Sequence, residues 1–520
     1  MSLKSALLPS ESGNAALQTE VPQPTRAANR TVISLAIFLG VSLLYVAISR
    51  GVFLYGDDIL MFQVTESIVE PGDVAVTSPW HEGDIARAIP GRGGKGYSKY
   101  GVGQSLVAIP AYVASDLILV KLLPIHVFID GYGNQRMGAI VYGTALTNTV
   151  IGGATVALVY LLAVACGFSR RTALVVAGLL AFGTLLAHYS ATFLSEPLTG
   201  LALTGTVYGL VRSDSDGATG PTRYGYRWLA FSGFMAGLAL GSRVATGLML
   251  IAPGLWLLWL AWRWSQRSRR DAILALGVWG VPVVLWLIGI AWYNWVRFGS
   301  VSETGYGSEW QQMTTPFLTG LSGLLISPGK GLLWYNPPLL LALAGGIWFA
   351  RRRRDLTLVI AGMLVGALLL YSRYYVWYGG GVWGTRFLVP MLPLLVLPAG
   401  EIVERAWHGR RAFAVATGVI AAVGLFVTAL GIMVPFDRYV GEYNVTPEQH
   451  DAAIWEIADS PLVVHAERLD DTWRDPDIAA DRYASKSLVA ISLVTGFAGL
   501  GSLVLATRGV MRGRFPKAPG

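Results

Sequence analysis

Residues 272–295 read AILALGVWGVPVVLWLIGIAWYNW, an apolar run without one acidic or basic side chain. At a rise of ~1.5 Å per residue, about 20 helical residues cross a hydrocarbon core of ~30 Å. Similar runs recur along the whole chain, which is 53% hydrophobic and only 14% charged. Soluble proteins carry about 25% charged residues. The sequence therefore predicts an all-α, polytopic membrane helical bundle with extracytoplasmic loops and juxtamembrane helices.

About twelve spanning helices are expected from the apolar runs. They lie near residues 31–51, 136–165, 171–188, 192–212, 227–242, 246–264, 272–295, 332–350, 355–372, 387–406, 411–435 and 486–507. Basic clusters lie at 170–171, 212–227, 263–270, 351–354, 405–411 and 508–517. Two spans separate each cluster from the next, so the positive-inside rule places all of them in the cytoplasm. A thirteenth span at 105–123 would turn the later clusters outward. That segment contains Pro110, Asp116 and Lys121, so we expect it in the interface or as a re-entrant turn.

This topology divides the chain into four parts. We expect a disordered cytoplasmic tail at 1–30, a transmembrane bundle at 31–435 with its first external loop at 52–135, and an acidic extracytoplasmic loop at 436–485. A last span and a basic cytoplasmic tail occupy 486–520. The long polar segments gather outside, where loops longer than a connection needs usually carry function.

Charge and cysteine content exclude some classes of function. The net charge of +8 would suggest nucleic acid in a soluble protein, but here the arginines follow the topology, so no nucleic-acid partner is expected. The single cysteine, Cys166, excludes an internal disulfide and a multi-cysteine metal site.

Acidic residues lie beside the first two external turns. Asp57 and Asp58 follow the first span, where paired carboxylates suit a general base and a partner that orients it or binds a cation. They could also cap a short surface helix at 59–70. His188 and Glu196 lie at the second external turn, where Glu196 is a candidate for substrate binding or for helix capping.

Three cations lie on the expected outer side, against the general pattern. Lys99, followed by Tyr100, ends a glycine-rich segment that lacks phosphate-loop spacing. Arg243 ends the span at 227–242, and Lys330 precedes the span at 332–350. Each could bind an anionic substrate group. The alternative for the lysines is snorkelling to the interface, and for Arg243 a single interfacial arginine.

The segment from Trp377 to Phe387 combines aromatic residues, glycines and a cation. Sugars stack on aromatic faces, so Trp377 and Trp383 are candidates for carbohydrate binding, and Arg386 could bind phosphate or hydroxyl groups. An aromatic belt at the membrane interface would explain the aromatic residues equally well. It would not explain the glycines or Arg386.

The order of these motifs resembles the GT-C superfamily of membrane glycosyltransferases, which use polyprenyl-phosphate sugars. Aminoarabinose transferases, protein O-mannosyltransferases and arabinosyltransferases belong to it. The resemblance covers roughly residues 31–400. It implies that Asp57 is the catalytic base with Asp58 as its partner, and that Lys99 and Arg243 lie near the lipid phosphate. Glu196 matches the acidic residue of the second external loop, whereas the two residues after Lys99 depart from the family's usual Pro-Pro.

The resemblance implies an inverting transfer. Asp57 would accept the proton of the acceptor hydroxyl, and Arg243, with Lys99 or Arg386, would stabilise the phosphate as its charge grows. Asp58 and Glu196 could hold Mg²⁺ or Mn²⁺ or position the acceptor, so no cofactor is certain.

The expected partners are a polyprenyl-phosphate sugar, an acceptor glycan, lipid or protein, and the bilayer. We expect a bacterial inner (plasma) membrane protein with its active site outside. A transporter or flippase of lipid-linked sugars is one alternative, which predicts ionisable residues near the bilayer midplane. A glycan polymerase or ligase is another, but the loop at 436–485, with His450 and His465, is mostly acidic.

Overall fold

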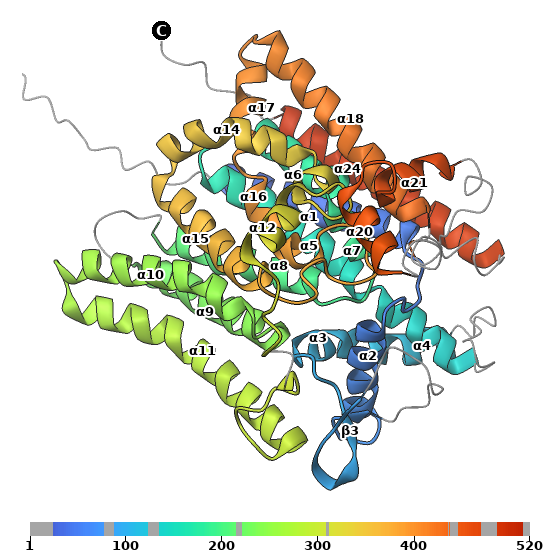
Figure 1. Cartoon of the computed structure of the whole chain (residues 1–520). Coiled ribbons are helices and arrows are strands. Elements are labelled where there is room, and N and C mark those ends of the chain that lie inside the picture. Colours follow the sequence, from blue (N-terminus) through green and yellow to red (C-terminus); the bar gives the residue numbers. More distant parts are fainter. Residues whose placement is uncertain are drawn as a thin grey trace, which may run out of the picture.

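The computed structural model describes residues 24–76, 88–122, 135–214, 221–307, 311–434, 436, 446–469 and 486–512. In these ranges the chain is a bundle of helices with one small sheet of three short strands (Figure 1). The predicted all-α fold class is confirmed. The tail predicted at 1–30 lies largely outside the described residues, but α1 (Pro24–Ile48) begins inside it.

Nine helices of the described ranges are long and apolar enough to cross a membrane. These segments contain α1; α3 (Gly103–Ser115) with its π-helical continuation η2 (Asp116–Leu122); α4 (Gln135–Ala145) with α5 (Thr147–Ala165); α10 (Thr246–Ser265); α11 (Arg269–Phe298); α15 (Arg354–Tyr371); η4 (Arg386–Met391) with α16 (Leu392–Leu395) and α17 (Ala399–Trp407); α18 (Arg411–Met433); and α24 (Lys486–Arg512).

The surface of these helices confirms an integral membrane protein. Only 6% of the most apolar window of α11 is buried, and large side chains such as Leu285, Ile288 and Trp292 are exposed. An apolar surface of this size is unfavourable in water but matches hydrocarbon. The segment Gly103–Leu122 is also apolar enough to span, yet it packs on α2 (Gly56–Val69) and α4. Its interfacial placement stays a prediction.

Four other predicted spans are helical but shorter or more polar. The run at 171–188 breaks at Thr184 between α6 (Arg170–Gly183) and α7 (Leu185–Ser190), because the Thr184 hydroxyl caps α7. The span predicted at 332–350 corresponds mainly to α14 (Pro338–Arg352), which starts six residues later than expected. The spans predicted at 192–212 and 227–242 correspond to α8 (Glu196–Ser213) and α9 (Arg223–Ser242). The number of spans therefore stays a prediction.

The span predicted at 387–406 is not one regular helix. It consists of η4, α16 and α17 in succession, with Pro390, Pro393 and Pro398 along it. Proline removes a backbone hydrogen bond and clashes with the preceding turn, which explains the interruptions. The irregular start of this segment brings Arg386 into the interior of the protein.

Helix α8 lies in the centre of the bundle. It packs on α5, α9 and η4, and all its residues except Leu201 and Arg212 are buried. Small and hydroxylated residues allow this close packing, and its threonine hydroxyls donate to backbone carbonyls one turn earlier, as Thr204 does to Gly200. The N-terminus of this central helix carries Glu196.

The segment predicted to form the first external loop packs as a small unit below the bundle in the view of Figure 1. It contains α2, which begins three residues before the helix predicted at 59–70 and ends one residue earlier, then β1 (Ala75–Val76), β2 (Ile89–Pro90), η1 (Arg92–Gly94), β3 (Gly96–Tyr97) and α3. The strands pair antiparallel in the order β1-β3-β2, with Tyr97 opposite Ala75 and Ile89.

The segment after β3 is fixed against the end of α9. A Cβ atom on Gly101 would lie 2.3 Å from the carbonyl oxygen of Gly241, and one on Gly103 would lie 2.6 Å from the Ser242 hydroxyl. Only glycine allows this approach. The two residues before Gly101, Lys99 and Tyr100, are thereby held next to the C-terminal end of α9.

Short helices complete the side of the bundle that carries the long loops. They are α12 (Phe317–Ile326), α13 (Leu332–Tyr335), α20 (Pro447–Trp455) and α21 (Pro461–Glu467). The last two belong to the loop predicted at 436–485, and α21 packs on α18. The acidic residues of that loop from Asp470 to Asp481 lie outside the described residues.

Candidate active site

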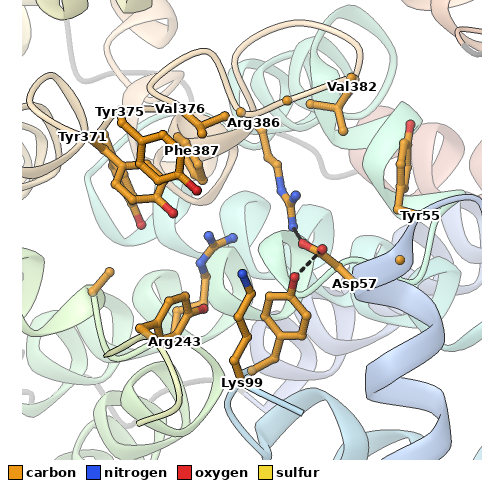
Figure 2. A pocket seen from close by; sticks show the side chains of 18 of the residues that line it. Tyr55, Asp57, Lys99, Arg243, Tyr371, Tyr375, Val376, Val382, Arg386 and Phe387 are labelled. Carbon is orange, nitrogen blue, oxygen red and sulfur yellow. Dashed lines mark hydrogen bonds and ion pairs between the residues drawn. The ribbon is translucent and has the colours of Figure 1, made fainter. Parts of the chain in front are cut away.

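Side chains from several separate segments meet at one cavity of about 870 Å³ (Figure 2). Among the charged residues that line it are four that the sequence singled out, from the first turn of α2, the loop before α3, the end of α9 and the start of η4: Asp57, Lys99, Arg243 and Arg386. Buried Glu196, at the start of α8, bonds to two of them. The structure thus brings together the predicted acids and cations that lie more than 300 residues apart in sequence.

Asp57 receives hydrogen bonds on both carboxylate oxygens. The hydroxyl of Tyr100 donates to Oδ1, and Nη2 of Arg386 donates to Oδ2 at 2.5 Å. Figure 2 shows this group facing the same open space as Arg243 and Lys99. Asp57 is therefore oriented by two fixed donors beside a cationic wall.

Glu196 links the two arginines. Its Oε1 accepts hydrogen bonds from Nε of Arg386 and from Nη1 of Arg243. The Glu196 side chain is fully buried, whereas the side chains of Arg386 and Arg243 are 11% and 16% exposed. One carboxylate thus holds two guanidinium groups side by side at the edge of the cavity, despite their mutual repulsion.

The environments of the adjacent carboxyls push their pKa values apart. Burial raises the pKa of Asp57, but the charge of Arg386 and the hydrogen bonds from Tyr100 and Arg386 lower it more, so it lies below the ordinary value. Burial and the charge of Asp57 raise the pKa of Asp58 well above its ordinary value. Asp57 is consequently the ionised member of the pair, as a general base must be.

Asp58 does not line the cavity. It is fully buried, its Oδ2 accepts the backbone N–H of Leu54 at 3.3 Å, and its Oδ1 has no partner. This side chain fixes the turn that leads from α1 into α2. Asp58 therefore lies behind Asp57 and stabilises the backbone of the site, and its side chain does not face the cavity.

Lys99 and Tyr100 are positioned by an arginine that the sequence did not single out. The guanidinium of Arg297, in α11, is buried and donates to the carbonyl of Ser98 and, at 2.7 Å, to Oδ1 of Asn294. The Lys99 amine lies 5.7 Å and 5.6 Å from the ring centres of Tyr100 and Tyr306. Arg297 ends a span on the expected outer side, and this exception to the charge pattern could have indicated it.

His188 lines the cavity from α7. Its Nδ1 lies 2.8 Å from the carbonyl oxygen of Gly431 and must donate to it, since a carbonyl only accepts. The neutral ring then has an acceptor at Nε2, an atom without a hydrogen-bond partner. The predicted role in substrate binding is compatible with this place.

Lys330 is close to the cavity but not in its lining. Its amine donates to the carbonyl oxygens of Gly380 and Val382, at 3.0 Å and 2.5 Å, and burial lowers its pKa to about 7. Both carbonyls belong to the glycine-rich loop that forms one wall of the cavity. Lys330 therefore shapes this wall and is not placed to bind a ligand itself.

Trp377 and Trp383 lie beneath the cavity wall. Trp383 is fully buried and stacks on His465 with 4.5 Å between ring centres, and Trp377 packs on Trp455. Neither indole lines the cavity, so the structure gives no support to their predicted stacking on a sugar. The belt alternative also fails for Trp383, because a fully buried indole contacts no lipid headgroups.

The aromatic faces of the cavity come instead from tyrosines that the sequence did not single out: Tyr55, Tyr306, Tyr371, Tyr374 and Tyr375. Tyrosine at the end of a span is common at membrane interfaces, so these tyrosines could not be recognised as cavity residues from the sequence. Arg50 also lines the cavity. It is an arginine at the outer end of the span predicted at 31–51, and this departure from the charge pattern could have indicated it, as for Arg243.

The structure supports no particular metal site. In the ranges that the structure describes, no group of three or more His, Cys, Asp or Glu side chains could hold a metal ion. Glu196 is bonded to two arginines and Asp58 to a backbone amide. A divalent cation on these two carboxylates stays a prediction.

A model of the dolichyl-phosphate-mannose-protein mannosyltransferase family matches residues 119–302 of the chain. The predicted resemblance to GT-C glycosyltransferases is confirmed. So is the predicted enzyme class. The matched segment of this glycosyltransferase includes Glu196, Arg243 and Arg297, while Asp57 and Arg386 lie outside it. A comparison with curated protein sequences found no match.

Solved structures resemble this glycosyltransferase at low identity. The crystal structure of ArnT from Cupriavidus metallidurans bound to undecaprenyl phosphate is 12% identical, with a TM-score of 0.48, and the match covers 94% of this chain and 77% of that chain. The archaeal oligosaccharyltransferase AglB from Archaeoglobus fulgidus, in complex with an inhibitory peptide and a dolichol-phosphate, is 11% identical with a TM-score of 0.47. That match covers 84% of this chain and 61% of AglB.

Proposed function

We propose that the protein transfers a sugar from a polyprenyl-phosphate donor to an acceptor hydroxyl, with inversion, on the extracytoplasmic face of a bacterial inner membrane. One observation carries the proposal: the carboxylate of Asp57 faces the same cavity as the cationic side chains of Arg243, Arg386 and Lys99. A base and several cations around one space suit the reaction of a hydroxyl with a sugar on an anionic leaving group.

The chemistry is a single displacement. The acceptor oxygen attacks the anomeric carbon, its proton passes to Asp57, and the bond from the anomeric carbon to the phosphate oxygen breaks. The electron pair of that bond stays on the phosphate, which is a good leaving group without protonation. One carboxylate is therefore sufficient, in contrast to the two that most glycoside hydrolases use.

The cations of the cavity are suited to binding the phosphate of the donor. Arg243 contributes a rigid fork of N–H donors, which suits phosphate, and Lys99, which lies beside it in Figure 2, contributes a point charge. The name of the matched family, which includes a dolichyl-phosphate sugar, supports a polyprenyl-phosphate donor. Tyr371 and Tyr375 supply flat surfaces for the sugar or the first isoprene units.

The alternatives fit the charges less well. The ionisable groups of the cavity lie at helix ends, such as the first turns of α2 and α8, rather than within the spans as a transporter or flippase would need. A polymerase or ligase with histidines in its external loop would present them to the cavity. His450 packs on Tyr378 and His465 on Trp383, and neither lines it.

The test is sugar transfer by the purified protein in lipid nanodiscs. Polyprenyl-phosphate sugars with different radiolabelled hexoses and pentoses are offered with membrane-extracted glycan, lipid and protein acceptors. The proposal predicts label transfer from at least one donor, with the anomeric configuration of the product inverted. Retention of configuration would refute the single displacement, and transport of intact donor between leaflets without transfer would favour a flippase.

A further inference from the structure

Part of the positive charge of the cavity is paired with carboxylates before any substrate binds. Two carboxylates, Asp57 and Glu196, form ion pairs with two guanidinium groups, those of Arg243 and Arg386. Lys99 and Arg50 add further positive charge to the lining. A donor phosphodiester with one negative charge would therefore enter a site in which two of the cations are already paired with carboxylates.

Arg386 occupies the middle of this arrangement. Its Nε donates to Glu196 and its Nη2 to Asp57, so one guanidinium bridges the buried acid and the base. Arg243 bonds to Glu196 and lies over the ring of Phe387, 5.5 Å from its centre. Of the two arginines, Arg386 is thus the one that bonds directly to Asp57 in the resting site.

We infer that Arg386 transfers its electrostatic support from Asp57 to the leaving phosphate during the reaction. The inference rests on the proposed sugar transfer. As the acceptor proton reaches Asp57, that carboxylate changes from one negative charge to none. As the bond to the anomeric carbon breaks, the phosphate changes from one negative charge to two. The total charge of the cavity is constant, and the guanidinium released by one group is available to the other.

Glu196 makes this transfer possible without a large movement. It is fully buried and holds Arg386 through Nε, so the guanidinium stays in place when Asp57 loses its charge. An interaction that the phosphate gains only as its charge grows accelerates the chemical step rather than donor binding. Ground-state binding of the phosphate then depends on Arg243 and Lys99.

The inference is tested by a comparison of Arg386→Gln with Arg243→Gln. For Arg386→Gln we expect kcat to fall about 100- to 1,000-fold with a nearly unchanged donor Kd, as for the loss of a transition-state donor. Arg243→Gln should raise the donor Kd about tenfold or more. Donor Kd is measured with a non-transferable phosphono analogue in nanodiscs, and kcat by single-turnover transfer.

A second readout distinguishes this role from a merely structural one. Arg386 lowers the pKa of Asp57, so the acid limb of the pH profile of kcat/KM should move to higher pH in Arg386→Gln. Arg386→Lys keeps the charge and should leave the limb closer to the wild-type position, which also provides a variant if the glutamine protein does not fold. Wild-type protein without transfer from any donor would refute the proposed function. An active wild type whose two glutamine variants weaken donor binding equally, with the acid limb unchanged, would refute only the charge transfer.

Discussion

Replacement of Glu196 by glutamine should lower the free energy of unfolding more than the same replacement of Glu401, another carboxylate that bonds to two arginines. Glu196 is fully buried and neutralises Arg243 and Arg386, whose side chains are only 16% and 11% exposed. Removal of one partner of a buried ion pair costs about 3–5 kcal/mol, because the remaining charge is left without compensation. In Glu196→Gln two guanidinium groups would share the single charge of Asp57, so we expect the full cost.

The chain offers a matched control at the expected cytoplasmic side. Glu401 also bonds to two arginines, Arg352 at 2.5 Å and Arg405 at 2.7 Å, but their side chains are 35% and 24% exposed. Water can solvate these two when the carboxylate is lost. We therefore expect about 1–2 kcal/mol for Glu401→Gln, between a surface pair and a buried one.

The assay is unfolding of both variants and the wild type in the same detergent, followed by tryptophan fluorescence, together with sugar transfer. The expected order of unfolding midpoints is wild type, then Glu401→Gln, then Glu196→Gln. Transfer should fall about 10²-fold only in Glu196→Gln, since the arginines at the cavity lose their position. A Glu196→Gln protein that unfolds no earlier than Glu401→Gln would refute the reasoning.

Two further changes test the supporting residues. Asp58→Asn keeps an oxygen for the Leu54 amide and needs no proton, so it should unfold at the wild-type midpoint at pH 7 and retain most of its sugar transfer; a loss of transfer as large as in Asp57→Asn would contradict the supporting role. Lys330 has a pKa lowered by burial to about 7 from 10.5, so the folded state binds fewer protons than the unfolded state between these values, and stability should rise with pH there. Chemical denaturation of Lys330→Met at pH 7 and pH 9.5 should lack this rise, and an equal rise in both proteins would exclude Lys330 as its source.

The residues that the sequence selected and the structure brings together were selected for two reasons. Arg243 and Lys99 depart from the predicted positive-inside pattern, and Asp57 and Glu196 lie in the first turns of helices that follow predicted external turns. The predicted topology places all of these positions on one side of the membrane. Residues far apart in sequence were therefore expected on one surface without knowledge of their contacts.

Side-chain direction could not be predicted in the same way. Trp383 and Tyr375 flank the same glycine-rich loop, yet the indole points into the core and the phenol lines the cavity. The direction depends on the backbone at Gly379, Gly380 and Gly384, which have positive φ values of 81°, 79° and 66°. Sequence indicates that glycine permits such angles but not which residues adopt them.

The hydrogen-bond and ion-pair partners of the charged residues could not be predicted from the sequence either. The sequence made Glu196 a candidate for binding a metal cation or the acceptor, whereas in the structure its carboxylate forms ion pairs with two arginines. Lys330 was a candidate ligand for an anion, but its amine is used by two backbone carbonyls. Both differences arise from partners that are 47 or more residues away in the chain.

The most direct test of the central claim, that Asp57 is the base of a sugar transfer, is the single-turnover rate of Asp57→Asn beside the wild type and Asp58→Asn. Asparagine keeps the size of the side chain and can still bond to Tyr100 and Arg386, but it cannot accept the acceptor proton. The account predicts that transfer is abolished in Asp57→Asn, with donor binding retained, and is largely preserved in Asp58→Asn. Substantial transfer by a folded Asp57→Asn protein would contradict it.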